Sequence, residues 1–521
     1  MKTLFRDALL ISPDVELEGA SVLVEDKVVR RIYTCGEKLP ETDRVVNVQG
    51  DMLVPGFIDV HTHGCAGRDF SYGTPEAIRT FAENKLKEGV TTMLPTTSTQ
   101  SEETLANALK SAADYVKNGG KGPKMPGAHL EGVFINPKCL GAQNPAYLRD
   151  PDIREVLRLN EIFPVKKVSY AVEMPGGAVF AAELLEHGVV PSCVHSAATY
   201  AQFSEAYEHG LRNLSHFCNQ MTPLKHREIG LVGAGLMHED LYLELICDTL
   251  HVCPDMLNLI FQIRDVNHIM LITDSVEASG MPEGEYRLAG LPIILKDGAV
   301  RVKEHPEALA GSVLTMNAAL RNAYEVTGYP LKDLIKTTSW NQAQALGLEK
   351  VGRIQPGYAA DLAILSGDFE VENVFVDGEM LYSAEQKMKR FLLPGVLLLL
   401  FLFHFAAGWR IAETKPSFFY HNDGAEYAEM AESFAKTGSM TIAKPRYYEP
   451  PRSEPMPEAF RPPLLSFLAG LLLRAGLVPA AAYALSRSKP AQSVYTDSIW
   501  YQSPAGRMAF TASNSVQKYR C

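Results

Sequence analysis

The sequence predicts an α/β protein built on a (β/α)8 barrel with a small flanking β-sandwich. Three observations indicate this fold. Short apolar runs typical of strands alternate with helical segments, polar residues follow several of these runs where they end, and strand-rich segments lie on both sides of the alternating region. The alternation covers about 290 residues, close to the usual ~250 of such a barrel, in which the chemistry lies at the C-terminal ends of the strands.

The two ends of this region share one pattern. Residues 1–53 contain short strand-like runs, such as 22–24 and 28–33, that are bounded by glycine and acidic turn residues and lack a helical period. A similar pattern returns in residues 345–383, with runs at 353–365 and 374–381. We expect both ends to pair into one β-sandwich domain.

The predicted barrel is the segment between them, residues 54–344. Its strand-like runs end in polar residues and are separated by longer helical stretches. These runs are 54–63, 91–95, 127–132, 191–195, 213–216, 242–248 and 268–274.

The first of these runs carries two histidines. A short apolar strand leads into His61-Thr62-His63 and stops at Gly64. Residues two apart in a strand point to the same face, so His61 and His63 project together from its C-terminal end. Two converging imidazoles form half of a divalent-metal site.

Four later strand-like runs end in candidate ligands or bases: Glu131, His195, His216 and Asp274. Taken singly, each has an ordinary structural explanation, such as a hydrogen-bonded core histidine or, for Asp274, a helix N-cap. Taken with His61 and His63, they match an N/O-ligated divalent site with room for water. These ligand types accept Zn, Fe or Mn, so the sequence leaves the metal, and the choice between one ion and two, open.

Charge and cysteine usage limit the class of protein. The net charge of −11 argues against a nucleic-acid binder. The eight cysteines are scattered and form no CxxC pair, which suits a reducing compartment. The N-terminus does not resemble a signal peptide, because Asp7 interrupts a very short apolar run. We therefore expect a cytoplasmic catalytic region.

Several motifs resemble a known group of enzymes. Val54-Pro-Gly-Phe-Ile-Asp-Val-His-Thr-His-Gly64 resembles the opening motif of the amidohydrolase superfamily. Further segments resemble the N-acetylglucosamine-6-phosphate deacetylase family in particular: His129-Leu-Glu-Gly, Gly141-Ala-Gln-Asn-Pro, the run 216–230, Asp248-Thr-Leu-His251, Ile272-Thr-Asp-Ser and Leu309-Ala-Gly-Ser. The resemblance covers roughly residues 1–383, and the run after His216 is its most specific part.

The resemblance implies roles for the strand-end residues. Glu131, His195 and His216 would be the metal ligands, and Asp274 the general acid/base. Some members of the family lack the first two histidines and hold one metal ion. Because His61 and His63 are both present here, the resemblance leaves room for a second ion bridged through Glu131.

It also implies a substrate pocket and a homodimer. The residues expected to contact the phosphorylated sugar are Asn219, Gln220, Arg227 and His251, with Ala142, Gln143, Leu309, Ala310 and Gly311 completing the pocket. In the family the phosphate-binding arginine reaches across from a neighbouring subunit. Two residues depart from the pattern of the family. Val133 stands where many members have proline, and Gln143 stands where some have histidine. The change at Gln143 would alter how the acetyl carbonyl is held.

The chemistry fits these residue types. Water at neutral pH is a poor nucleophile for an amide, and a divalent ion lowers the pKa of bound water from about 15.7 to ~7 while polarising the carbonyl. Asp274 can accept the proton of that water and give it to the departing amine. Arg227 and His251 suit a dianionic phosphate.

The chain changes character after Arg390. Residues 391–409 are apolar on every face and near the ~20 residues of a membrane helix, and residues 463–485 form a less regular second candidate. The basic residues that flank these spans predict that residues 1–390 are cytoplasmic and the loop 410–462 is external. The predicted segments are therefore 384–486, with membrane spans, and 487–521, a polar tail without structure.

The external loop contains Asp423 and resembles the first loop of multi-spanning, lipid-phosphate-dependent glycosyltransferases. The chain lacks the many further spans of that family, so the tail is typical of a fusion or a frame artefact. Three functions remain open: a metal-dependent deacetylase with an anchoring or inert tail, another amidohydrolase acting on a different amide, and a membrane-anchored glycosyltransferase fragment.

Overall fold

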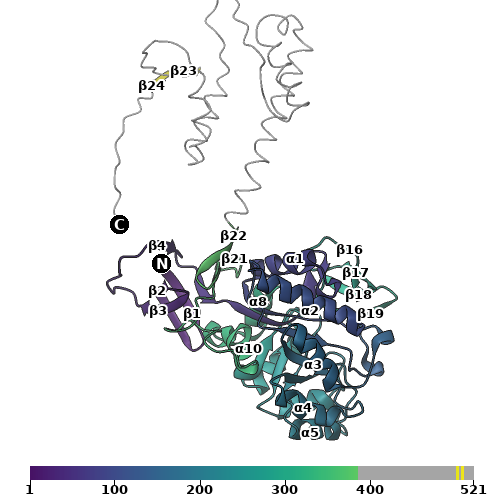
Figure 1. Cartoon of the computed structure of the whole chain (residues 1–521). Coiled ribbons are helices and arrows are strands. Elements are labelled where there is room, and N and C mark those ends of the chain that lie inside the picture. The colour runs from purple at the N-terminus through teal and green to yellow at the C-terminus, as the bar shows by residue number, and fades with distance from the viewer. Residues whose placement is uncertain (385–499, 504–505, 510–521) are drawn as a thin grey trace, which may run out of the picture. The chain divides into compact units, whose positions relative to one another are not determined.

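The computed structural model describes residues 1–384, 500–503 and 506–509 (Figure 1). One eight-stranded sheet joins the two ends of the 1–383 region, in the order β22-β21-β20-β5-β1-β2-β3, with β4 paired to β1. The central contact is antiparallel, Leu362 of β20 opposite Pro55 of β5. The strands are β1 (Lys2–Ser12), β2 (Val15–Glu25), β3 (Val28–Tyr33), β4 (Arg44–Asn47), β5 (Met52–Pro55), β20 (Leu362–Leu365), β21 (Val371–Val376) and β22 (Glu379–Ser383).

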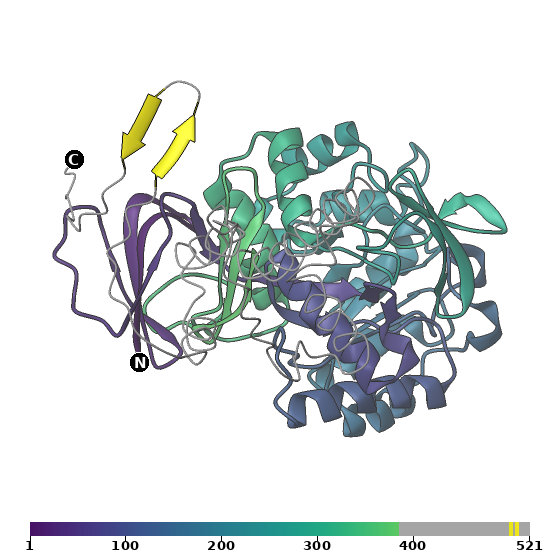
Figure 2. The same cartoon turned by 90° about the horizontal axis from the view of Figure 1, so that it is seen from above.

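This sheet has a core of its own. Phe5 of β1 packs edge-to-face on Phe375 of β21, with ring centroids 4.7 Å apart, and both side chains are fully buried. Figure 2 shows the first strands, in purple, beside the last ones, in green. Burial of large aromatic side chains from both chain ends holds them together.

The second sheet is parallel and curls into a half-barrel. Strands β10 to β15 pair in sequence order, and β6 pairs with β9. A backbone bridge between Thr96 and His129 connects β9 to β10. The strands are β6 (Phe57–Thr62), β9 (Val90–Pro95), β10 (Ala128–Glu131), β11 (Val165–Tyr170), β12 (Val190–Cys193), β13 (Asn213–Leu214), β14 (Tyr242–Leu245) and β15 (Ile269–Leu271).

Helices follow these strands, and neighbours in sequence pack side by side from α1 to α5 (Figure 1). Local capping starts them: Thr74 caps α1 through Ala77 N–H, and Thr199 with Gln202 forms a capping box on α5. The helices are α1 (Pro75–Lys85), α2 (Glu102–Lys117), α3 (Ile153–Ile162), α4 (Gly177–Glu186), α5 (Tyr200–Glu208), α6 (Gly230–Met237), α7 (Pro254–Ile263), α8 (Met316–Thr327), α9 (Leu331–Leu334) and α10 (Trp340–Ala345).

An antiparallel sheet interrupts the segment predicted to be barrel. Its strands are β16 (Gly284–Leu288), β17 (Leu291–Lys296), β18 (Ala299–Val302) and β19 (His305–Leu309). The turn between β17 and β18 is Asp297-Gly298, both residues with positive φ, which is a strong hairpin signal. This insertion was not expected from the sequence, although the hairpin signal is present in it.

Two further segments differ from the sequence-based expectation. Residues 353–361, expected to continue a strand, form an irregular segment with a turn at 356–357 and a single bridge between Val28 and Ala359, and the strand begins only at Leu362. Within the tail segment expected to lack structure, β23 (Trp500–Ser503) and β24 (Gly506–Ala509) form an antiparallel hairpin that begins with Trp500 and Tyr501, residues of high strand propensity.

In the described part of the chain, every helix is too short or too polar to cross a bilayer. The spans predicted at 391–409 and 463–485, and the loop with Asp423, lie outside the described residues.

Candidate active site

The strand-end side chains meet at one edge of the parallel strands. His195, His216 and Asp274 follow β12, β13 and β15, and each has a left-handed backbone, with φ of 43°, 31° and 48°. Such conformations cost about 1–3 kcal/mol each in residues other than glycine and persist where the surroundings fix them. The strained turns direct these side chains toward His61 and His63 at the end of β6.

Glu131, the last residue of β10, lies at the centre of the site. Its Oε1 is 3.2 Å from Nε2 of His61, 3.3 Å from Nε2 of His216 and 3.7 Å from Nε2 of His195. Its Oε2 is 3.4 Å from Nε2 of His63. All five side chains are buried.

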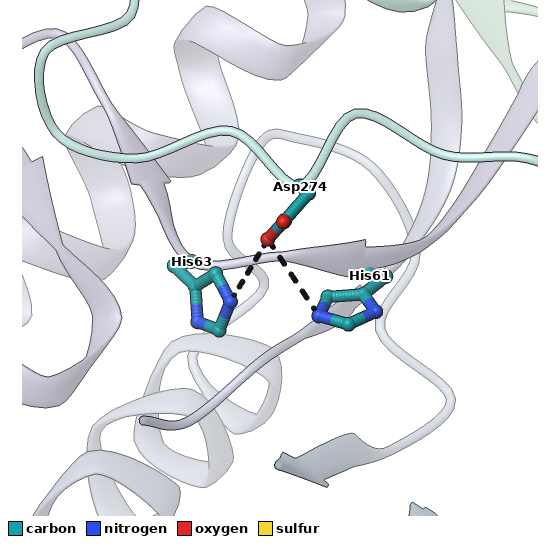
Figure 3. A group of neighbouring side chains, drawn as sticks. All are labelled: His61, His63 and Asp274. Atoms are coloured by element: carbon teal, nitrogen blue, oxygen red, sulfur yellow. Dashed lines mark ion pairs between the residues drawn. The ribbon is translucent and has the colours of Figure 1, made fainter. Parts of the chain in front are cut away.

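Asp274 contacts the same ring nitrogens of His61 and His63 that face Glu131. Its Oδ1 lies 3.1 Å from Nε2 of His63 and 3.7 Å from Nε2 of His61 (Figure 3). The six side chains form two groups of three in which ligand atoms lie within 4.8 Å of one another: His61, His63 and Asp274, and Glu131, His195 and His216. Each group has the donor types of a zinc-like site.

In each of the four histidines of the site, the ring nitrogen Nδ1 lies next to a polar atom of a neighbouring residue. Nδ1 of His195 donates to the carbonyl of Cys139 (2.6 Å), that of His216 to the carbonyl of Asn219 (3.2 Å), and that of His63 lies 3.3 Å from Ser98 Oγ. Nδ1 of His61 donates to Glu244 Oε2 (3.0 Å). The four Nε2 atoms therefore face the same space around Glu131.

That space suits a cation. Nε2 of His61 is buried and makes no hydrogen bond to any described residue, although Glu131 lies near it. An unpaired buried ring nitrogen is expensive unless a ligand satisfies it. The residues present therefore fit a divalent metal ion, in line with the expectation from sequence.

The electrostatics of the site reflect its burial. Burial, with the neighbouring His216, lowers the pKa of His195 to about 4, so its imidazole is neutral at pH 7. Burial opposes the charge on His61, but the carboxylates of Glu131 and Glu244 outweigh it and raise the pKa of His61 to about 10.

A pocket of about 240 Å³ opens beside this centre. It is lined by seven of the predicted substrate residues: Ala142, Gln143, Asn219, Gln220, His251, Leu309 and Gly311. Ala310 is fully buried behind them. Gly141, Ile246, Leu288, Glu307 and Ala308 line the pocket as well and were missed, the last three because they lie on or next to the inserted β16–β19 sheet.

Arg227 is the predicted residue that the structure does not bring to the pocket. Its side chain is exposed, and it is absent from the lining of this chain's pocket. It lies in the loop before α6, between Lys225 and Glu228, which form an isolated backbone bridge.

Two predicted pocket residues have defined partners. Gln143 donates from Nε2 to Glu131 Oε2 (2.8 Å) and accepts from Thr99 N–H at Oε1 (2.8 Å). His251 donates from Nδ1 to Asp248 Oδ2 (2.6 Å). Gln143 thus holds the central carboxylate in place, a role the sequence did not suggest.

Sequence reasoning also missed Glu244 and Lys167, which lie behind His61. A signal was available for Glu244, since it is a charged residue inside the apolar run 242–247. A buried charge without a nearby opposite charge in sequence indicates a partner elsewhere in the fold.

Comparison with known proteins identifies the family. The amidohydrolase family profile matches residues 52–132 and 173–381. The chain belongs to the amidohydrolase family. The resemblance inferred from the motifs is thereby confirmed.

Other amidohydrolases of known activity are similar along most of their length. The chain is 34% identical to an N-acetylgalactosamine-6-phosphate deacetylase of Escherichia coli O157:H7, over 73% of this chain and 99% of that protein. It is 34% identical to an N-acetylglucosamine-6-phosphate deacetylase of Lysinibacillus sphaericus, over 61% and 82%.

Solved structures of deacetylases are also similar to this chain. The N-acetylglucosamine-6-phosphate deacetylase of Thermotoga maritima matches with a TM-score of 0.66 and 33% identity, covering 73% of this chain and 100% of that one. An Asp-to-Ala mutant of the Mycobacterium smegmatis enzyme, in complex with N-acetyl-D-glucosamine-6-phosphate, matches with a TM-score of 0.69 and 30% identity over the same shares.

Proposed function

We propose that this amidohydrolase hydrolyses the acetamide of N-acetylglucosamine 6-phosphate to glucosamine 6-phosphate and acetate, in amino-sugar catabolism. The observation that carries the proposal is the buried Glu131 carboxylate among four imidazoles, with Asp274 beside them at the edge of a sugar-sized pocket. The deacetylases similar to this chain, which match it over 82–100% of their own length, support the same substrate class.

Glu131, His195 and His216 would hold one divalent ion, and His61 and His63, with Asp274 near them, a second. Zn, Fe and Mn all accept this N/O donor set. When bound, the ion acidifies water and polarises the acetyl carbonyl.

Asp274 is the proposed general acid/base. Burial opposes its ionisation, but hydrogen bonding to His63 holds the pKa of Asp274 below its usual value, so the carboxylate can accept a proton. Oδ1 would take the proton of the attacking water and return it to the amine nitrogen, because an unprotonated amide nitrogen is a very poor leaving group. Gln143 keeps Glu131 oriented during these steps.

The sugar would occupy the pocket between Ala142, Asn219, Gln220 and His251, with the 309–311 turn closing it. The side chain of Arg227 is exposed and does not line the pocket of its own chain. We therefore keep the expectation that Arg227 contacts the phosphate of a substrate bound to the neighbouring subunit of a homodimer.

We also propose that the parallel strands close into a complete barrel. Asp274 N–H donates to His61 O (2.9 Å), which connects the end of β15 to β6. Together with the Thr96–His129 bridge, this contact supports a closed (β/α)8 barrel over residues 54–344, flanked by a β-sandwich of 1–53 and 345–383. The scattered free cysteines support a cytoplasmic catalytic region.

A second candidate substrate is N-acetylgalactosamine 6-phosphate, favoured by the 34% identity to the deacetylase of that sugar. The two substrates differ in configuration at one hydroxyl-bearing carbon, and both carry the acetamide and the phosphate that the site would recognise.

The test is acetate release by the full chain from both phosphorylated sugars and from unphosphorylated N-acetylglucosamine, with metal content measured on the same preparation. We expect the highest kcat/KM for N-acetylglucosamine 6-phosphate. A higher value for the galactose epimer would assign the second substrate, and no release from either phosphorylated sugar would refute the proposal.

A further inference from the structure

A buried ion pair lies inside the parallel strands behind the metal centre. Lys167 of β11 and Glu244 of β14 are 2% and 0% exposed and form an ion pair between Nζ and Oε1. Neither side chain lines the pocket, and the proposed hydrolysis does not use them. A buried pair is often no more stabilising than apolar residues of the same volume, so its presence calls for another reason.

The other oxygen of Glu244 contacts a metal-ligand candidate. Oε2 accepts the Nδ1–H of His61 at 3.0 Å, while Oε1 is engaged by Lys167. This contact directs Nδ1–H of His61 toward Glu244 and leaves Nε2 as the ring nitrogen that faces the metal position. Nε2 is the buried atom without a hydrogen bond that faces Glu131 and Asp274.

His61 differs from the other histidines in this respect. His195 and His216 donate from Nδ1 to backbone carbonyls, and His63 lies near the hydroxyl of Ser98. Of these four imidazoles, His61 alone is held by a carboxylate. A carboxylate acceptor orients an imidazole and raises its strength as a ligand, and its loss typically weakens metal binding by about 10–100-fold.

We propose that the Lys167–Glu244 pair is a positioning device for His61 that sets the affinity of the second metal position, formed by His61, His63 and Asp274. Lys167 holds Glu244 in the orientation from which Oε2 reaches His61. The position formed by Glu131, His195 and His216 has its own partners and does not depend on the pair. This inference rests on the proposed metal-dependent function and concerns the occupancy of one of its two positions.

The test compares two charge-balanced double variants of the full chain. Lys167→Met with Glu244→Gln removes both charges and keeps an oxygen that can accept the His61 Nδ1–H. Lys167→Met with Glu244→Leu also removes both charges, but it removes the acceptor as well. Ser192→Ala is the control, because Ser192 is buried in the same sheet and bonds to Ser215 rather than to a metal-ligand candidate.

Metal content after dialysis, and the Kd of the weaker ion by chelator competition, are measured for the parent and each variant. We expect two ions per chain in the parent and in Ser192→Ala. The Leu variant should bind the weaker ion at least tenfold less tightly than the Gln variant. Both double variants should retain the ion at Glu131, His195 and His216.

Three outcomes would overturn the inference: one ion per chain in the parent, equal Kd values in the Gln and Leu variants, or loss of both ions together. Melting temperatures report how much each double variant destabilises the fold. A pair with a purely structural role would lower the metal affinity of the two double variants equally, whereas a positioning role lowers it more in the Leu variant. Acetate release by the parent distinguishes the two levels of the argument. If the parent releases acetate and the two Kd values are equal, the deacetylase function stands and the positioning role is refuted. If the parent releases no acetate but the Kd values differ as expected, the positioning role stands and the deacetylase function is refuted.

Discussion

The metal end and the sugar end of the pocket are built differently. At the metal end, the Nδ1 atom of each histidine has a neighbour from the same chain and the side chains are buried. At the sugar end, His251 is fixed by Asp248, but Arg227 is exposed and absent from the pocket lining. One chain thus preorganises the chemical centre, whereas the residue proposed to bind the phosphate does not line the pocket of its own chain.

The largest effect should follow from breaking the metal end at its centre. Glu131→Gln keeps the shape of the side chain but removes the charge that faces four imidazoles. Because carboxylate ligands bind as anions, we expect loss of bound metal together with loss of acetate release. Metal analysis and an activity assay check this, and a variant with full metal content and normal turnover would contradict the central role of Glu131.

Asp274→Asn tests the proton transfer separately from metal binding. Asn retains the hydrogen-bonding reach but cannot accept a proton, so kcat should fall by at least the ~10²-fold typical of a positioned acid/base. The ion at Glu131, His195 and His216 should remain, as measured by metal content. Asp265→Asn, at an exposed residue before β15, is the control. Turnover of Asp274→Asn near that of the parent would exclude Asp274 as the acid/base.

Arg227→Ala tests the sugar end. The lost contact should raise KM for the phosphorylated sugar by an amount equivalent to about 2–5 kcal/mol, the range for truncating one partner of a buried charge pair. Unphosphorylated N-acetylglucosamine should be unaffected, because it never used the contact. Lys225→Ala, exposed in the same loop, is the matched control.

Mixing variants sharpens this prediction. If Arg227 acts on the neighbouring subunit, randomly paired Arg227→Ala and Asp274→Asn chains should regain about a quarter of the parent's active sites, since each mixed dimer contains one intact site. Equal losses on both sugars, or no recovery on mixing, would mean that Arg227 does not bind phosphate across the interface.

The smallest effect is expected at Asp248. Asp248→Asn replaces a charged acceptor of the His251 Nδ1–H by a neutral one, and the difference between such hydrogen bonds is roughly 1 kcal/mol. KM for the phosphorylated sugar should rise several-fold with kcat nearly constant. Steady-state kinetics check this against Asp255→Asn, an exposed acid at the start of α7, and an unchanged KM would exclude an orienting role.

The strand-end residues were predictable because they follow from local rules. The two-residue period of a strand places His61 and His63 on one face, and the C-terminal ends of parallel strands meet at one edge. Glu131, His195, His216 and Asp274 could therefore be assigned to a common site without knowing how the strands curl. Their distances to Glu131 and to one another agree with that assignment.

The contacts behind these residues were decided by the tertiary structure alone. Glu244 is 183 residues from His61 and 77 from Lys167, and the carbonyl that orients His195 belongs to Cys139 in a separate loop. No local pattern relates such positions, because their approach depends on the curl of the sheet and on the packing of neighbouring strands. For the same reason, the sequence supplied the side chains of the pocket but not the inserted β16–β19 sheet that closes it, nor the exposure of Arg227.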